Sequence, residues 1–450
     1  MKVLLTAPPL ADLDAPGKKE HLHASPNLGI YLLASVLSEN GQKVKLIDPS
    51  VFEDRLGTAE LAASETSDVD VLAVSINSCT WPRALRLFRE LEEKGKRPLT
   101  IIGGPHASVL DEHVASFPVV DYVIRGEGER SFPRLLECLG KGADPGEVPG
   151  ITFFRGDRLV KTDQGPLLTP EELAELPMPA FDLMPEGYYD LVPIETSRGC
   201  YHACIFCSIS FKRKWRGMGP STLAERFQSQ ERYLDKTRRQ SFFIIDDCFT
   251  ADHDRLSATA DVLSGIDSPL CFEARITDVI APGVLDSIQR LPVAIMEMGV
   301  ESGYAEGLQK MGKGLKMDQV MGAIALLEKI GFGDKARFSF VMGLPWETRQ
   351  EILKTLEFAF KITGRMGARL IASWLTVFPG SIIYKTRGKW GIEMDENYFD
   401  NELWWRSGEV FERTHPGLDM EKDVDTIVTY IKMMKELFPQ IQHDGFFRWL

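Results

Sequence analysis

The chain has 450 residues, more than one usual domain, so its length predicts two or three domains. Its 65 acidic and 52 basic side chains give a net charge of −13, which argues against nucleic acid or an anionic membrane as the main partner. No apolar stretch reaches the roughly 18 residues of a membrane span. The short apolar start is followed at once by Asp12 and Asp14, so we expect a first buried strand, not a signal peptide, in a cytoplasmic protein.

Residues 1–142 alternate apolar strand patterns with helix patterns. We expect helices at 26–39 and 83–94, and strands at 3–5, 44–47, 69–74, 99–102 and 120–124. Near-continuous apolar strands between helices predict a parallel sheet covered on both faces, that is, a doubly wound Rossmann-like α/β domain. Ligands of such sheets bind beyond the carboxyl ends of the strands.

The loops at those carboxyl ends are rich in glycine and small polar residues. Glycine lets the backbone approach a flat ligand closely, and four such loops on one rim are stronger evidence than a single one. Trp81 could instead pack at a helix start, and His106 could instead cap the following helix. The candidate rim residues are Pro8, Asn27, Leu28, Gly29, Ser75, Asn77, Ser78, Trp81, Gly103, Gly104, His106, Gly126, Glu127 and Gly128.

The rest of the chain divides into three parts. Residues 143–187 read as a connector with a hairpin at 150–160 and a proline-rich end. Residues 391–450 form a short, mostly helical tail in which Trp404 and Trp405 either line the substrate site or pack on the preceding domain. Between them, residues 188–390 alternate helices with six strand patterns, at 192–196, 242–246, 271–274, 295–299, 338–342 and 370–374.

Three cysteines follow the first of these six strands, at positions i, i+4 and i+7: Cys200, Cys204 and Cys207. A structural zinc site normally takes four protein ligands, so three clustered thiols favour an iron–sulfur cluster with one open iron. The alternative is a zinc knuckle completed by His202 or by a distant residue. The total of seven cysteines is odd, which is a poor disulfide framework and indicates a reducing compartment.

The spacing Cys-x3-Cys-x2-Cys, with Phe206 before the last cysteine, resembles the radical S-adenosylmethionine (SAM) superfamily. The resemblance implies a partial (β/α)6 barrel and a [4Fe–4S] cluster held by the three cysteines. It also implies SAM bound at the open iron, with Phe206 along the adenine. An electron donor such as flavodoxin or ferredoxin would reduce the cluster, and SAM would then be split into methionine and a 5′-deoxyadenosyl radical.

Later strand ends of this region carry candidate SAM ligands. Asp246 and Asp247 resemble the family's replacement for a Gly-Gly-Glu motif and would accept hydrogen bonds from the SAM ammonium group, although an Asp that caps the next helix is the alternative. A guanidinium matches a carboxylate with two parallel hydrogen bonds, so Arg275 is the candidate for the methionyl carboxylate. Glu301 or Ser302 would take the ribose hydroxyls, and Gly343 lies in a segment that resembles the adenine-side motif.

The glycine-rich rim upstream resembles the cobalamin-binding domain of the cobalamin (B12)-dependent radical SAM family, of the class B methyltransferase type. Many B12 carriers bind cobalt through an Asp-x-His-x-x-Gly motif, but the loop at 48–54 has no histidine. The resemblance therefore implies base-off cobalamin without a histidine ligand. The segment 77–81 is the candidate for the lower face of the corrin, and His106 could bond a corrin amide.

The resemblance implies an enzyme that methylates an unactivated carbon of a small-molecule or natural-product substrate, and we expect it to be a monomer. The alternative is an oxidative cyclase or a ring-rearranging enzyme that uses both cofactors without net methyl transfer. Methylthio transfer is disfavoured, because that family carries three further N-terminal cysteines and only Cys79 and Cys138 are present here. A non-enzymatic cobalamin or iron–sulfur carrier is a fourth possibility.

Overall fold

The computed structural model describes residues 1–8, 25–48, 66, 68–93, 97–439 and 441. The chain divides into two compact units. Unit 1 comprises residues 1–193, 230–240 and 395–404, and unit 2 comprises residues 194–229, 241–394 and 405–450. No helix in the described ranges is both long enough and apolar enough to cross a bilayer.

Unit 1 is built on a seven-stranded sheet in the order β2-β1-β3-β4-β5-β6-β7. The first five strands in this order pair in parallel, and the hairpin β6–β7 adds to β5 in antiparallel fashion. The strands are β1 (Lys2–Thr6), β2 (Lys43–Ile47), β3 (Val71–Ser75), β4 (Leu99–Gly103), β5 (Tyr122–Ile124), β6 (Ile151–Arg155) and β7 (Arg158–Lys161).

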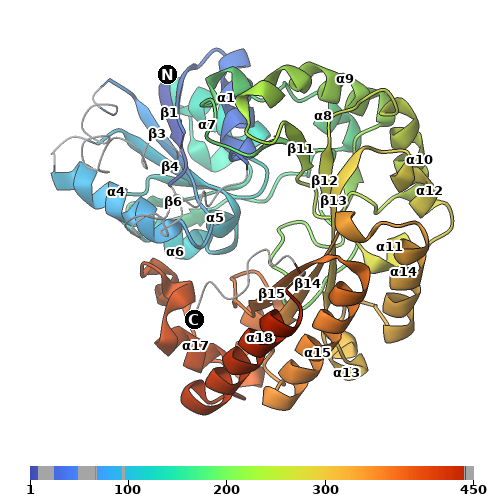
Figure 1. Ribbon diagram of the computed structural model, residues 1–450. Helices are drawn as coiled ribbons and strands as arrows, with labels where there is room; N and C mark the ends of the chain where they lie inside the picture. The colour runs from blue at the N-terminus through green and yellow to red at the C-terminus, as the bar shows by residue number, and fades with distance from the viewer. Residues whose placement is uncertain (9–24, 49–65, 67, 94–96, 440, 442–450) are drawn as a thin grey trace. The chain divides into compact units, whose positions relative to one another are not determined.

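Helices cover the sheet of unit 1 (Figure 1). They are α1 (Leu28–Glu39), α4 (Trp81–Glu93), α5 (Pro105–Val109), α6 (Asp111–Ala115), α7 (Gly128–Gly140) and α8 (Pro170–Ala174). One core cluster joins strand residues such as Val3 and Ala73 to Leu37 of α1 and Leu135 of α7. The alternate strand residues, Leu72 among them, are buried as well, so both faces of the sheet are covered.

Unit 2 is built on a six-stranded sheet in the order β15-β14-β13-β12-β11-β8. Neighbouring strands from β11 to β15 pair in parallel, and β8 and β15 are the two edges, so the described residues form an open, partial barrel. The strands are β8 (Leu191–Ile194), β11 (Ser241–Ile244), β12 (Leu270–Ala274), β13 (Val293–Glu301), β14 (Ala336–Met342) and β15 (Arg369–Trp374). A short pair, β9 (Ser197–Arg198) and β10 (Arg216–Gly217), flanks the cysteine loop.

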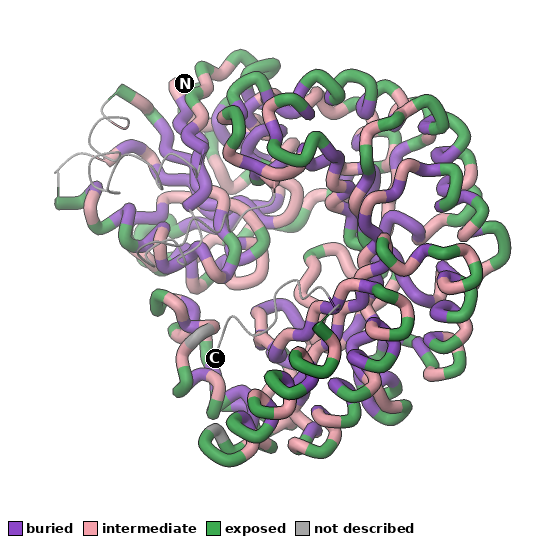
Figure 2. The backbone as a smooth tube through the Cα atoms, in the orientation of Figure 1, coloured by how far each residue is buried: buried purple, intermediate pink, exposed green. Residues whose placement is uncertain are grey.

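The helices of unit 2 pack on one face of its sheet. On β14, for example, Phe338 and Phe340 are fully buried, and the Phe340 ring contacts Phe358 of α15. The intervening residues of β14 are only half-buried and lie on the opposite face, which we call the inner face. Figure 2 shows the buried strands and the exposed outer sides of the helices. The helices are α9 (Pro220–Gln230), α10 (His253–Val262), α11 (Ile276–Val279), α12 (Val284–Gln289), α13 (Ala305–Lys310), α14 (Met317–Lys329), α15 (Arg349–Met366), α16 (Ile382–Lys385), α17 (Gly408–Thr414) and α18 (Asp425–Leu437).

Local signals explain several of these boundaries. The Asn27 side chain accepts a hydrogen bond from the Gly29 N–H at the start of α1. A capping box of Thr348 and Glu351 begins α15, and Gly367 ends it with a φ of 65°. The predicted fold class is confirmed: a Rossmann-like α/β unit is followed by a partial barrel and a helical C-terminal region. The loop at 49–54, on which the absence of a histidine ligand rests, lies outside the described residues.

Candidate functional site

The cysteine loop of unit 2 is anchored at several points. Gly199 has a φ of 83°, and a Cβ there would lie 2.6 Å from the carbonyl oxygens of Lys214 and Phe211, so only glycine fits. The Cys200 N–H donates to the Phe211 carbonyl, and the Lys212 ammonium donates to the Gly380 carbonyl at 2.8 Å. These contacts hold the loop at the carboxyl edge of the sheet.

The three thiols of this loop are the predicted cluster ligands. None of the seven cysteines forms a disulfide, Cys200 and Cys204 are buried, and Cys207 is half-buried. Burial raises the pKa of Cys200 and raises that of Cys207 to about 11, so a bound metal is what would hold them as thiolates. Among the described residues, no group of three or more His, Cys, Asp or Glu side chains is placed to hold one metal ion, so the choice between an iron–sulfur cluster and a zinc knuckle rests on the sequence pattern. Phe206 is half-buried in the same loop.

The two consecutive aspartates have different surroundings. Asp246 is buried, and its carboxylate accepts from the Thr196 N–H at 2.7 Å and from the hydroxyls of Thr196 and Ser197. It therefore ties β11 to the strand that leads into the cysteine loop. Asp247 accepts from the Gly199 N–H at 3.1 Å, and its side chain is exposed to solvent. Desolvation by the protein atoms around it, together with the neighbouring Asp246 charge, raises the pKa of Asp247 to about 6.

A buried ion pair lies at the end of β13. The Lys313 ammonium contacts the Glu301 carboxylate at 2.7 Å and donates to the Gly299 carbonyl. Glu301 has a φ of 74°, which is rare for a residue other than glycine, and it sits at a bulge in the β13–β14 register. A Cβ on Gly299 would lie 2.4 Å from the Lys313 nitrogen, so glycine there makes room for the pair.

Arg275 follows β12 and is almost fully buried, with one amino group donating to the Lys313 carbonyl at 2.6 Å. Burial raises the pKa of the Cys200 thiol, and the positive charge of Arg275 acts in the opposite direction and lowers it. The Asp247 charge acts on the same thiol, so three predicted residues from separate strand ends influence one another electrostatically. The other two candidates, Ser302 and Gly343, contact neighbouring protein groups. The Ser302 hydroxyl is buried against the Tyr304 backbone, and Gly343 packs beside His415 and Trp374.

Sequence reasoning missed a layer of charged residues on the inner face. The strand register places Glu273 opposite Glu297, Glu297 opposite Arg337, and Arg337 opposite Arg369. Glu297 and Arg337 form an ion pair at 3.3 Å. Glu273 is exposed to solvent, but desolvation by the surrounding protein, with Glu297 and Asp247 nearby, raises its pKa to about 8, which favours the protonated carboxyl at neutral pH. The alternation of polar and apolar residues along β12 and β14 is the signal that predicts such a layer.

A second group of residues that the sequence did not predict lies next to Gly343. Buried Glu347 accepts from the Leu344 N–H at 2.9 Å and from the Tyr304 hydroxyl at 3.1 Å, and burial raises its pKa to about 7. Tyr304 in turn accepts from the Trp346 indole at 3.2 Å. Fully buried His415 lies against Gly343, and burial lowers its pKa to about 4, so its ring is neutral.

The rim residues of unit 1 fall into an accessible and a buried group. Gly104 has a φ of 100°, and a Cβ there would lie 2.4 Å from the Ile76 carbonyl, so neighbouring backbone requires the glycine. Gly126 donates to Ser108, and Glu127 accepts from the Leu168 N–H at 2.7 Å. The exposed or half-buried members are Asn27, Gly29, Ser75, Asn77, Gly103, Gly104, Gly126, Glu127 and Gly128, and the buried ones are Pro8, Leu28, Ser78, Trp81 and His106.

Trp81 and His106 are packed within unit 1. Their rings stack at 5.8 Å, and burial lowers the pKa of His106 to about 3. The Trp404 indole donates to the Ser78 carbonyl at 2.9 Å, so Trp404 packs in this unit and not on the barrel. The accessible backbone of the rim suits a flat ligand, whereas corrin contacts by Trp81 and His106 remain predictions.

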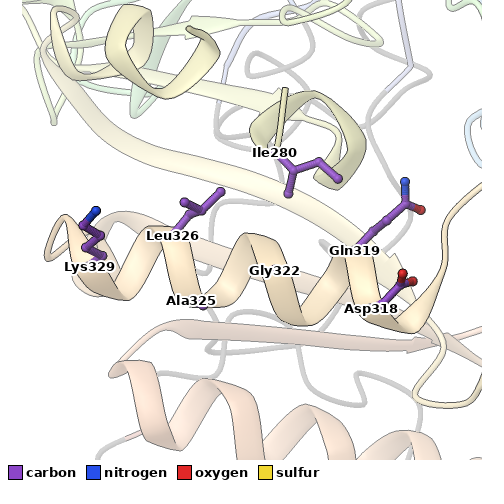
Figure 3. A pocket seen from close by; sticks show the side chains of 7 residues that line it. All are labelled: Ile280, Asp318, Gln319, Gly322, Ala325, Leu326 and Lys329. Atoms are coloured by element: carbon purple, nitrogen blue, oxygen red, sulfur yellow. The ribbon is translucent and has the colours of Figure 1, made fainter. Parts of the chain in front are cut away.

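A shallow groove of about 550 Å³ also lies on unit 2 (Figure 3). It runs along α14 past Ile280, on the side of that helix opposite its buried residues, with Leu326 and Lys329 in its wall. None of the residues predicted to bind a cofactor lines it, so it is separate from the candidate site.

Two family models match the chain. The B12 binding domain matches residues 22–136, and the radical SAM superfamily matches residues 194–359. Among solved structures, the radical SAM methyltransferase TsrM from Kitasatospora setae aligns with a TM-score of 0.66 at 16% identity, over 88% of this chain and 80% of that one. At this identity the match establishes the fold.

Three curated relatives extend the comparison. An uncharacterised methyltransferase of Pyrococcus horikoshii is 28% identical over 86% of this chain and 83% of its own length. The hopanoid C-3 methylase of Methylococcus capsulatus is 30% identical over 68% of this chain and 59% of its own length. The anaerobic magnesium-protoporphyrin IX monomethyl ester cyclase of Synechocystis is 24% identical over 73% of this chain and 66% of its own length.

The matched domains occur in the order that the sequence predicted, and the cysteine loop lies where the second one begins. The chain is therefore an enzyme of the cobalamin-dependent radical SAM family, whose cofactors are cobalamin, SAM and a [4Fe–4S] cluster.

Proposed function

We propose that the enzyme methylates an unactivated carbon of a small-molecule substrate. The observation that carries the proposal is the pairing of the two domains in one chain that also aligns with proteins named as methyltransferase and methylase. When bound, the three cofactors together would supply the means to remove a hydrogen atom from carbon and a methyl group to replace it.

The residues of the inner face have distinct proposed roles. Cys200, Cys204 and Cys207 would hold the cluster. Asp247 is the better candidate for the SAM ammonium group, because the oxygens of Asp246 already accept from Thr196 and Ser197.

The candidates at the later strand ends serve the rest of SAM. Arg275 donates from one amino group to the Lys313 carbonyl and from Nε to the Thr277 hydroxyl at 3.5 Å, and its remaining N–H groups are the candidates for the methionyl carboxylate. Glu301, held by Lys313, is the candidate for the ribose hydroxyls. The neutral Glu273 carboxyl could donate a hydrogen bond to a substrate without adding charge to the site.

A second candidate function uses the same cofactors without net methyl transfer, and the alignment with the cyclase favours it. Label transfer separates the two. We expect the reduced, cobalamin-loaded enzyme to move label from [methyl-³H]SAM into the corrinoid fraction and then into an organic product. If all the label stays in SAM and methionine, methyl transfer is wrong and the cyclase-type reaction is favoured.

We also propose a monomer that works in the cytoplasm with an electron donor of the flavodoxin or ferredoxin class. None of the seven cysteines forms a disulfide, which suits a reducing compartment. Arg213 and Lys214 are exposed directly after the cysteine loop and suit an acidic reductant. Neutralising both should slow reduction of the cluster by flavodoxin and leave reduction by dithionite unchanged.

A further inference from the structure

Residues 395–404 come from the C-terminal part of the sequence but belong to unit 1. The segment contains the 3₁₀ turn η7 (Glu396–Asp400), whose start is capped by the Asp395 side chain at the Asn397 N–H. Phe399 is fully buried and Trp404 is 2% exposed. The segment is therefore an integral part of the unit that matches the B12-binding model.

Asp400 makes polar contacts between the segment 395–404 and the rest of unit 1. Its carboxylate accepts from the Trp81 indole at 2.7 Å and lies 2.9 Å from the ring nitrogen Nε2 of His113. Trp81 is the first residue of α4, and His113 lies in α6. One side chain thus joins two helices that follow different strands of the rim.

Two aromatic residues complete the contact. The Trp404 indole donates to the Ser78 carbonyl at 2.9 Å, and the Phe399 ring meets His106 edge-on at 5.7 Å. The Ser78 hydroxyl and His106 Nδ1 are themselves 3.0 Å apart. Residues 399–404 therefore contact the loop after β3 and the first turn of α5.

The contact leaves one part of the loop after β3 accessible. Ser78, Thr80 and Trp81 are buried, whereas Asn77 is exposed and Cys79 is half-buried. Asn77 shapes this turn by accepting from the N–H groups of Cys79 and Thr80. The buried residues Ser78 and Thr80, on either side of Cys79, thus fix the positions of the accessible residues Asn77 and Cys79.

We propose that residues 395–404 clamp the loop 76–80 in the conformation that meets the lower face of the corrin, with Asp400 as its positioning residue. The inference rests on the cobalamin-binding role of unit 1. It gives the C-terminal region a part in cofactor binding, at a distance of some three hundred residues along the chain.

The test compares Asp400→Ala and Trp404→Phe with the control Glu402→Gln, an exposed carboxylate of the same segment whose nearest arginine nitrogens lie 4.0 Å away. The full-length, cluster-loaded enzyme is titrated with hydroxocobalamin. We expect Kd to rise about tenfold or more in both clamp variants and to stay at the parent value in the control, with iron content unchanged throughout.

A second readout separates positioning from general loosening of the fold. The EPR spectrum of bound cob(II)alamin reports the surroundings of cobalt, and it should change in Trp404→Phe, which keeps an aromatic ring but loses the hydrogen bond to Ser78 and part of the indole's buried volume. Parent-like Kd values and spectra in both clamp variants would overturn the proposal. Absence of corrinoid binding by the parent would instead contradict the cobalamin role of the unit.

Discussion

At the scale of single residues, the difference between Asp246 and Asp247 decides which carboxylate can serve a ligand. Both follow β11, and the sequence offers no way to tell them apart. The fold buries Asp246 against Thr196 and Ser197 and leaves Asp247 exposed, with one hydrogen bond from the Gly199 N–H. We therefore assign anchoring of the cysteine loop to Asp246 and ligand contact to Asp247.

This assignment predicts a pH dependence of SAM binding. The raised pKa of Asp247, about 6, means that its carboxyl is largely protonated at pH 5 and ionised at pH 7. Only the ionised form pairs with an ammonium group, so SAM affinity should rise with pH, by about tenfold between pH 5 and pH 7. Equilibrium dialysis of SAM with the cluster-loaded protein measures this.

The matched variants are Asp247→Asn and Asp261→Asn, the latter on the exposed surface of α10. Asp247→Asn should bind SAM weakly with no pH trend, and Asp261→Asn should behave like the parent. A parent-like pH trend in Asp247→Asn would assign the titration to another group.

Glycine positions give a second prediction at this scale. Gly343 and Gly367 share a positive φ, but a Cβ on Gly343 would lie 2.5 Å from the His415 ring, whereas a Cβ on Gly367 would meet nothing within 4 Å. Gly367→Ala should cost about 1 kcal/mol of unfolding free energy through backbone strain alone. Gly343→Ala should cost about 1–3 kcal/mol more, because the core must also shift.

Urea unfolding monitored by circular dichroism measures both variants, and the Gly367 variant serves as the strain-only control. Equal losses in the two would show that the His415 side of the Gly343 turn is loosely packed.

At the scale of elements, strand positions could be predicted to within about two residues, because apolar runs between helices mark them directly. The cysteine loop was placed correctly for the same reason. The inner-face layer was not predicted, because Glu297 and Arg337 lie on strands separated by two helices, and only the register brings them together. Lys313 was missed likewise, since no motif marks it as the partner of Glu301.

The Glu301–Lys313 pair gives the prediction at this scale. Removing the ammonium leaves a buried carboxylate on a strained backbone, so Lys313→Met should lower the free energy of unfolding by about 3–5 kcal/mol. The control Lys354→Met removes an exposed partner of Glu351 on α15 and should cost less than about 1 kcal/mol. Similar small losses in both variants would contradict a stabilising role for the Glu301–Lys313 pair.

At the scale of the whole molecule, the two units do not follow the order of the sequence. Unit 1 takes residues 230–240 and 395–404 from later in the chain, and its core includes Phe399 and Trp404. Sequence patterns predicted the Rossmann-like and barrel parts but not this exchange, because the tail has no periodicity that points to a partner. A fragment that ends before residue 395 would lack the side chains that cover Trp81 and Ser78.

The central claim is that Cys200, Cys204 and Cys207 hold the cluster that cleaves SAM in a protein that also binds cobalamin. The most direct measurement is anaerobic incubation of the reconstituted enzyme with SAM and dithionite, followed by quantification of 5′-deoxyadenosine. We expect the parent and a Cys138→Ala control to release it, and Cys204→Ala to release none while still retaining hydroxocobalamin. Release at the parent rate by Cys204→Ala, or no release by the parent with a complete cluster, would contradict the account.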